Sequence, residues 1–292
     1  MTDRHAELIE RLMAWARADE NIRALVQTGS AARQDGSADR FSDRDIEVIA
    51  RDREPLLASD AWFHAIGPVM VALRLENGDF FDTRLVFYEG GRKIDFTVAD
   101  RSRLDAMIGA NRLDDLYARG YRVLLDKDGL AARLPASTGS APRRALPAQD
   151  EFAATVTEFW FEVAHMPTYL VRDEGWVVKF RDWTMKEMLL RMLEWHALAT
   201  GGPETDTWHI GTKLRRWVDV ETWDEVHEVF SRFDRADTWR GLVATIGLFT
   251  RLTRETAAAL GFAYPIQAEQ SVTAYVLGFE DEIARLDGSS SD

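Results

Sequence analysis

One segment constrains the architecture of this chain more than any other feature: residues 135–147, which interrupt every regular pattern. Three of the chain's 8 prolines fall here, together with a glycine and several small residues. Proline removes a backbone donor and glycine weakens regular elements, so this composition favours an irregular connection. We therefore expect a first domain over residues 1–134, a linker over 135–147 and a second domain over 148–292.

The two expected domains differ in hydrophobic periodicity. Before the linker, short strand-like runs alternate with helix-like segments, and Gly90-Gly91 suits a tight hairpin turn. After the linker, apolar residues recur at helical spacing. The chain is thus predicted to be α+β, with an N-terminal mixed sheet and helices followed by a C-terminal all-α helical bundle. The expected elements are a helix over 5–18, strands over 22–28, 45–50, 83–88, 93–98 and 121–125, helices over 152–165, 183–200, 239–260 and 271–286, and a capping box at 222–225.

The charge balance and the absence of cysteine narrow the possible functions. The net charge of −13 argues against a nucleic-acid partner and fits a small cationic substrate better, although an ordinary acidic protein would show the same balance. Without cysteine, disulfides, thiolate zinc sites and a cysteine nucleophile are excluded. The start of the chain does not resemble a signal peptide, and no apolar run reaches the roughly 18 residues of a membrane span. We expect a cytoplasmic protein without a membrane partner, either a monomer or a weak homodimer.

Two short motifs in the first domain could bind a phosphate and a metal. Gly29-Ser30 follows a strand-like run, where a glycine lets the backbone approach a phosphate, but a plain turn is the commoner meaning of this pair. Asp43-Arg44-Asp45 opens the next strand-like run, and side chains two apart on a strand point the same way. Both carboxylates could therefore bind Mg²⁺, which prefers hard oxygen ligands, or they could form a solvated strand edge.

A third carboxylate, Asp95, lies inside the strand-like run 93–98. Ile94, Phe96 and Val98 share one face of that run, so Asp95 is expected on the other face with Lys93 and Thr97. A half-buried, unpaired carboxylate is costly, and either a metal site or solvent exposure would relieve that cost.

The order of these three motifs resembles the Gly-Ser … Asp-x-Asp signature of the polymerase-beta-like nucleotidyltransferase superfamily. The resemblance extends to the aminoglycoside 6-adenylyltransferases, also called streptomycin adenylyltransferases, over roughly residues 1–285. Its matching stretches are Asp19–Arg23, Phe41–Ile46, Lys93–Thr97, Val123–Asp128, Glu158–Trp160 and Leu189–His196. The chain departs from that pattern at Ala31, where many members have an arginine directly after Gly-Ser, and Arg33 is expected to take over the phosphate contact.

The resemblance implies a nucleotidyltransferase-fold first domain that holds ATP and two Mg²⁺ ions. Gly29, Ser30 and Arg33 would contact the nucleotide, and Asp43 and Asp45 would bind metal. Asp95 would ligate the second ion, accept a proton from the acceptor hydroxyl, or do both. The reaction implied is transfer of AMP to an aminoglycoside, with O-6 of streptomycin as the expected acceptor and antibiotic resistance as the consequence.

The acceptor should be recognised by carboxylates and flat aromatic faces, because streptomycin-like molecules carry guanidinium groups. The helical half offers Asp182, Glu158 and Glu187 as candidate substrate-binding residues. The tryptophans at 176 and 183 could contribute aromatic faces, whereas those at 160 and 195 are expected to pack in the core.

Two other functions are compatible with the same motifs. The chain could adenylylate another small molecule or a protein, which the departure at Ala31 motivates. It could also be a catalytically silent module that binds a nucleotide or a partner, but a silent site would be expected to lose at least one of the three carboxylates.

Overall fold

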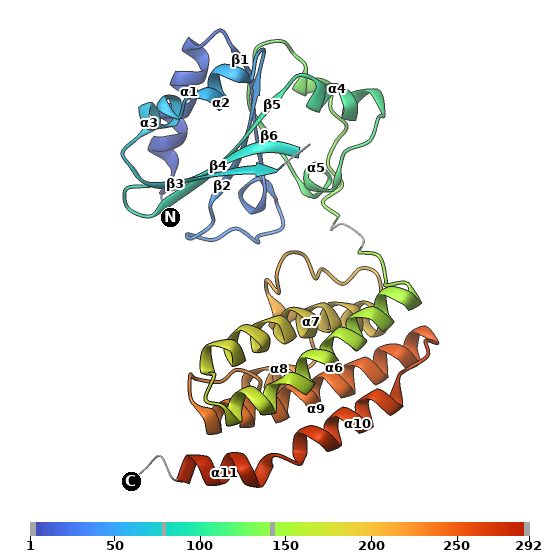
Figure 1. Cartoon of the computed structure of the whole chain (residues 1–292). Coiled ribbons are helices and arrows are strands. Elements are labelled where there is room, and N and C mark those ends of the chain that lie inside the picture. Colours follow the sequence, from blue (N-terminus) through green and yellow to red (C-terminus); the bar gives the residue numbers. More distant parts are fainter. Residues whose placement is uncertain (1–3, 78–79, 141–143, 289–292) are drawn as a thin grey trace. The chain divides into compact units, whose positions relative to one another are not determined.

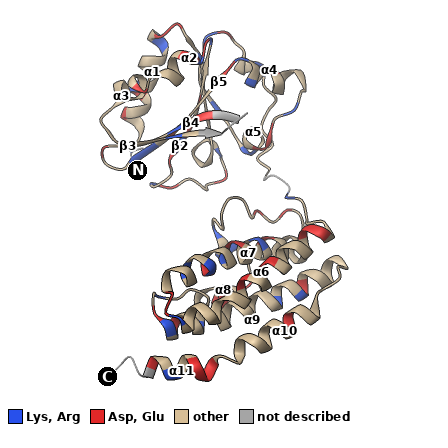
Figure 2. Ribbon diagram, in the orientation of Figure 1, with Lys and Arg blue, Asp and Glu red and all other residues tan. Residues whose placement is uncertain are grey.

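In the computed structural model, residues 4–77, 80–140 and 144–288 are described. The chain divides into two compact units, Met1–Pro142 and Arg143–Asp292 (Figure 1), and this division lies within the expected 135–147 linker. Among the described residues, no helix is long and apolar enough to cross a lipid bilayer. Lys and Arg are interspersed with Asp and Glu on both units (Figure 2).

The first unit is built on one six-stranded mixed sheet with the order β3-β4-β5-β2-β1-β6. Only β2 and β5 pair in parallel, and the other neighbours pair antiparallel. The strands are β1 (Ile22–Thr28), β2 (Arg44–Ala50), β3 (Val69–Asn77), β4 (Phe80–Tyr88), β5 (Arg92–Asp100) and β6 (Arg122–Asp126). The expected strands are all present. Gly90 and Gly91 adopt positive φ angles of 78° and 66° at the β4–β5 hairpin, so the predicted tight turn is confirmed.

Helices cover both faces of this sheet (Figure 1). They are α1 (Ala6–Ala18), α2 (Glu54–Ala58), α3 (Ala61–Ile66), α4 (Ser102–Gly109) and α5 (Asp115–Arg119). Leu8 and Leu12 of α1 and Phe63 of α3 pack with buried β2 and β5 residues, whereas Leu104 and Tyr117 from α4 and α5 form a separate core on the other face. The mixed sheet with helices was predicted, but β3 and α2 to α5 were not.

The second unit is all-helical, as predicted, and its core is rich in aromatic and methionine side chains. Its helices are α6 (Gln149–Val171), α7 (Gly175–Gly201), α8 (Val220–Glu228), α9 (Arg235–Leu260), α10 (Ile266–Leu277) and α11 (Glu280–Gly288). Phe159 of α6 stacks on Phe249 of α9 with ring centroids 3.5 Å apart. Trp160 and Trp195 are buried in this core, which confirms their predicted packing role.

Several predicted helix features of the second unit are wrong. The expected helix over 152–165 continues to Val171, with Pro167 inside it. Helix α7 begins eight residues before the expected 183, because the outward-facing Trp176 and Phe180 obscure its amphipathic pattern. The expected helix 271–286 is two helices, and its periodicity hides the break because Val276 and Ile283 both enter the core. The expected capping box is also absent.

The true N-cap of α8 is Asp219, whose side chain accepts a hydrogen bond from the Thr222 backbone N–H at 2.7 Å. Thr222 therefore lies within the helix, where its hydroxyl accepts a hydrogen bond from Arg251 at 2.8 Å. Threonine and aspartate are both favoured N-cap residues, so the sequence allows the helix to begin at either position. The helix begins at the earlier one, Asp219, three residues before Thr222.

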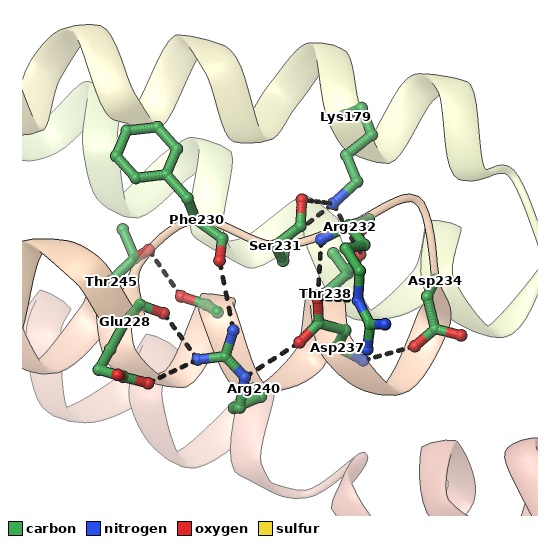
Figure 3. Close-up of polar contacts among 11 residues, drawn as sticks. Lys179, Glu228, Phe230, Ser231, Arg232, Asp234, Asp237, Thr238, Arg240 and Thr245 are labelled. Carbon is green, nitrogen blue, oxygen red and sulfur yellow. Dashed lines mark hydrogen bonds and ion pairs between the residues drawn. The ribbon is translucent and has the colours of Figure 1, made fainter.

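Lysine and arginine side chains stabilise the connection between α8 and α9 through hydrogen bonds within the second unit (Figure 3). The Lys179 ammonium donates to the Ser231 carbonyl, the Ser231 hydroxyl and the Thr238 hydroxyl at 3.1, 2.7 and 2.8 Å. Arg240 donates to the Glu228 carboxylate at 3.0 Å. These polar side chains are satisfied within the bundle, so this part of the unit is structural.

Candidate active site

The parallel pairing of β2 with β5 determines where the acidic side chains lie. Asp45 is the register partner of Asp95, and Asp43 immediately precedes β2. Ile94 and Phe96 are fully buried, so the alternation of the strand turns Asp95 to the opposite face, as the sequence predicts. Because parallel strands begin at the same edge of a sheet, the three aspartates meet at one edge.

The three carboxylates form a compact cluster around one ammonium group. One oxygen from each of Asp43, Asp45 and Asp95 lies within 4.8 Å of the others. The Lys93 ammonium donates to Asp43 Oδ2 at 3.1 Å and to Asp95 Oδ2 at 2.7 Å. One lysine cannot neutralise three carboxylates, so the cluster retains an excess of negative charge. Strand alternation places Lys93 beside Asp95, but only the fold shows that it also reaches Asp43.

Gly29 closes the cluster from the end of β1. Its φ of +67° lies in the left-handed region, and an added Cβ would stand 1.8 Å from Asp45 Oδ2. No other residue can therefore occupy this position without displacing the carboxylate. Ser30 then opens a short 3₁₀ turn, η1 (Ser30–Ala32), which ends at Arg33. The Gly-Ser pair is thus part of the acidic site and more than a plain turn.

Arg33 lies at the same edge of the sheet, where its positive charge opposes the rise in the Asp45 pKa. Its Nη1 is 3.7 Å from Asp35 Oδ2, and its Nε is buried without a hydrogen-bond partner among the described residues. The guanidinium therefore retains donor capacity beside the carboxylates, which suits an anionic group such as a phosphate.

Burial and mutual repulsion raise the pKa of two of the carboxylates, Asp45 and Asp95. Burial, followed by the charges of Asp43 and Asp95, raises the pKa of Asp45 to about 7. Burial also raises the pKa of Asp95, although Lys93 opposes this shift. Crowded carboxylates that cannot all ionise at neutral pH are a recurring property of acid–base and metal-binding sites.

The donor set fits a divalent metal ion. Carboxylate oxygens are hard ligands of the kind that Mg²⁺ prefers, and a cation would relieve the repulsion within the cluster. Asp95 Oδ1 is buried and has no hydrogen-bond partner among the described residues, which leaves one oxygen available. Asp43, Asp45 and Asp95 are therefore suited to hold Mg²⁺, and each would gain a compensating positive charge.

Glu47 shares the strand face of Asp45 but belongs to a different network. Its carboxylate pairs with Arg103 at 3.1 Å and accepts a hydrogen bond from the Tyr117 hydroxyl at 2.6 Å. Burial raises the Glu47 pKa, and Arg103 opposes this shift. Through these two contacts Glu47 joins β2 to α4 and α5 and stabilises the strand that carries Asp45.

The structure does not bring the three predicted acceptor carboxylates into one cluster. Asp182 is 8% exposed and accepts a 2.6 Å hydrogen bond from the Lys186 ammonium. Glu187 is exposed and accepts a hydrogen bond from the Trp183 indole at 3.0 Å, and Glu158 is exposed on α6. Lys186 is the partner that sequence reasoning missed, although its position four residues after Asp182 on a helix is a usable signal.

Comparison with known proteins gives consistent matches over nearly the whole chain. The sequence profile of the family described as streptomycin adenylyltransferase matches residues 2–279. An aminoglycoside 6-adenylyltransferase of Bacillus subtilis is 23% identical over an alignment of 283 residues, which covers 93% of this chain and 96% of the relative. The enzyme of the same name from Campylobacter jejuni is 22% identical over 289 residues, covering 94% of this chain and 98% of the relative.

Among solved structures, an aminoglycoside 6-adenyltransferase from Bacillus subtilis is similar to this chain. It covers 94% of this chain and 98% of its own, at 21% sequence identity and a TM-score of 0.43.

Proposed function

The chain belongs to the streptomycin adenylyltransferase family of enzymes, and on this basis we propose that it transfers AMP from ATP to an aminoglycoside hydroxyl in an Mg²⁺-dependent reaction. The proposed acceptor is O-6 of streptomycin, following the names of the family and of its relatives. Modification of the drug would confer resistance. The observation that carries the proposal is the compact cluster of Asp43, Asp45 and Asp95, whose oxygens lie within 4.8 Å.

Each carboxylate has a role that follows from its surroundings. Asp43 and Asp45 would hold Mg²⁺, and Asp95 would share in this binding. Two bound ions would neutralise charge on the triphosphate and stabilise the attacking and leaving oxygens. The acceptor oxygen attacks the α-phosphorus, the bond to the β-phosphate oxygen breaks, and pyrophosphate leaves. Asp95 is proposed to accept the hydroxyl proton, because burial raises its pKa and makes it a stronger base.

The nucleotide would be bound by the segment that closes the cluster. Glycine at position 29 lets the backbone lie directly against Asp45, since an added Cβ would stand 1.8 Å from Asp45 Oδ2, and backbone N–H groups beside the carboxylates would then be placed to bind phosphate oxygens. Ser30 and Arg33 would donate hydrogen bonds to those oxygens. Arg33 suits this role because its Nε has no partner among the residues described.

The direct test is pyrophosphate release by the full chain with ATP, Mg²⁺ and streptomycin, with mass spectrometry of the drug. We expect turnover and a product heavier by one AMP group. A folded protein that gives no turnover with streptomycin would exclude this acceptor. Spectinomycin, kanamycin and a no-drug reaction with labelled ATP serve as comparisons, and label transferred to protein would favour the alternative that the departure at Ala31 motivates.

A further inference from the structure

One face of α7 is polar and aromatic over almost its whole length and remains open. Trp176, Phe180 and Trp183 are 82%, 71% and 62% exposed, and Glu187 follows on the same side. Glu194 lies eighteen residues after Trp176, or about five turns of α-helix, so it continues this face. Large aromatic side chains are seldom left in water over three successive turns without a ligand or partner.

A cavity of about 310 Å³ lies beside this face near the C-terminal end of α7. A volume of this size is at the lower end of the range for small-molecule sites. Its lining is mixed in charge: Glu151 and Glu194 carry carboxylates, and Arg144 and Arg191 carry guanidinium groups. Thr207 adds a hydroxyl group to the same lining.

Two polar groups of this cavity lack partners. Thr207 is 1% exposed, and its hydroxyl oxygen makes no hydrogen bond within the described part of the chain. Glu194 is half-buried, and no hydrogen bond or ion pair joins it to any of the residues described. Lys179 in the same unit shows the contrast, since it has three oxygen acceptors (Figure 3). Buried polar groups normally find partners, so the unpaired Thr207 hydroxyl indicates a missing ligand, and Glu194 belongs to the same lining.

The cavity combines two carboxylates with two guanidinium groups, so its lining offers both acceptors and donors of hydrogen bonds. Burial raises the pKa of Glu194, although Arg144 and Arg191 oppose the shift. The Arg144 guanidinium lies over the Trp208 ring, 5.3 Å from its centroid. A polyphosphate would meet two carboxylates here, whereas an amino sugar could use acceptors and donors of both kinds.

We propose that this cavity binds an amine- or guanidinium-bearing ring of the aminoglycoside acceptor, with Glu194 as its main carboxylate and Thr207 as a hydroxyl partner. The inference rests on the proposed function and extends it by naming acceptor-binding residues. Glu194 accepts hydrogen bonds from the cationic group, Thr207 pairs with a ring hydroxyl, and the exposed aromatic face of α7 offers cation–π contacts to the rest of the molecule.

Asp182, one of the three acceptor candidates in the sequence, is less suited to this role. Its carboxylate already accepts the Lys186 ammonium at 2.6 Å, and Lys186 also donates to the Thr245 hydroxyl at 2.9 Å. A cationic ligand would have to displace an internal ammonium from Asp182. The charges that act on Glu194 are those of the Arg144 and Arg191 guanidinium groups, which line the same cavity but form no direct ion pair with it among the described residues.

The experiment is calorimetric titration of streptomycin into the full chain, without ATP or Mg²⁺. We expect Glu194→Gln to weaken binding about 10- to 100-fold, as loss of a charged hydrogen bond predicts. Glu280→Gln is the matched control, since it makes the same change on the exposed start of α11 and should leave affinity unchanged. Thr207→Val should weaken binding roughly 3- to 10-fold without lowering the melting temperature, because it removes a hydroxyl that has no hydrogen-bond partner among the described residues.

Wild-type affinity in Glu194→Gln and Thr207→Val would overturn the proposal. Tighter ATP binding by Glu194→Gln, with unchanged streptomycin affinity, would also overturn it by showing that the cavity receives an anion. The two proposals fail separately. If the protein binds streptomycin through Glu194 but never releases pyrophosphate, only the enzymatic function is refuted. If the protein adenylylates streptomycin but the Glu194→Gln variant binds the drug as tightly as wild type, only the cavity proposal is refuted.

Discussion

Each unit of this protein contains aspartate and lysine in direct contact, but the charge balance differs. In the first unit, Lys93 donates to Asp43 and Asp95 at 3.1 and 2.7 Å, and Asp45 adds a third carboxylate. In the second, Lys186 donates to Asp182 at 2.6 Å and to a threonine hydroxyl. The first cluster has three carboxylates for one ammonium, and the second has one for one.

This difference separates a binding site from a structural contact. Excess buried negative charge is costly without a further cation, which supports the proposal that the first cluster binds a cation that the described residues do not supply. The charges of Asp182 and Lys186 balance each other, and the Lys186 ammonium also donates to the Thr245 hydroxyl. This pair therefore stabilises the helical bundle. The two sites should therefore respond differently to mutation, to pH and to added metal.

The largest effect is expected at the centre of the unbalanced cluster. Asp45→Asn should lower kcat/KM for streptomycin adenylylation by about a thousandfold or more, because it removes a metal ligand and charge stabilisation of the transition state. Unfolding followed by circular dichroism should show equal or higher stability, since a repelled charge is lost. The exposed Asp115→Asn is the control and should retain full activity. A rate within tenfold of wild type would contradict the metal assignment.

The opposite pattern is expected at the balanced pair. Asp182→Ala should lower the free energy of unfolding by about 3–5 kcal/mol, because it leaves a buried ammonium without its countercharge. Urea denaturation measures this effect. The double variant Asp182→Leu/Lys186→Met removes both charges and should recover most of the loss. If Asp182→Ala were as stable as wild type but unable to bind streptomycin, Asp182 would be an acceptor ligand as the sequence suggests.

The contrast also shows what the sequence can predict. The order of Gly29-Ser30, Asp43-x-Asp45 and Asp95, with strand alternation, is sufficient to propose a cluster at one sheet edge. Family resemblance then adds the nucleotide and the acceptor class. The strands that carry the cluster follow from their short apolar runs, whereas β3 lacks a comparable pattern and was missed.

Partners that come from distant segments could not be predicted. The hydroxyl that completes the Lys186 environment lies on Thr245, 59 residues away, and the reach of Lys93 to Asp43 spans 50 residues. Glu194 and Thr207 meet only because the chain after α7 folds back to line a common cavity. Such contacts depend on how strands pair and helices pack, which local periodicity does not specify.

A smaller effect is expected from the titration of Asp45. Its pKa is about 7 in the folded protein against an ordinary value of 3.8, so between pH 4 and 7 the folded state binds more protons than the unfolded state. Stability in EDTA should therefore fall as pH rises through this range, by roughly 1–4 kcal/mol. Mg²⁺ should reverse the loss most strongly near pH 8, and Asp45→Asn should flatten the profile. Thermal unfolding across pH with and without Mg²⁺ measures both.

The last prediction compares the two lysines directly. Lys93→Met frees oxygens of Asp43 and Asp95, so we expect the affinity for Mn²⁺, measured by electron paramagnetic resonance without nucleotide, to rise roughly tenfold, or about 1.4 kcal/mol. Mg²⁺ should restore the melting temperature of this variant, because the ion takes over the role of the ammonium. Lys186→Met leaves Asp182 equally unpaired, but a single carboxylate in a bundle cannot hold a divalent ion, so Mg²⁺ should not rescue it. Equal rescue of both variants, or of neither, would show that the charge excess in the first unit does not mark a metal site.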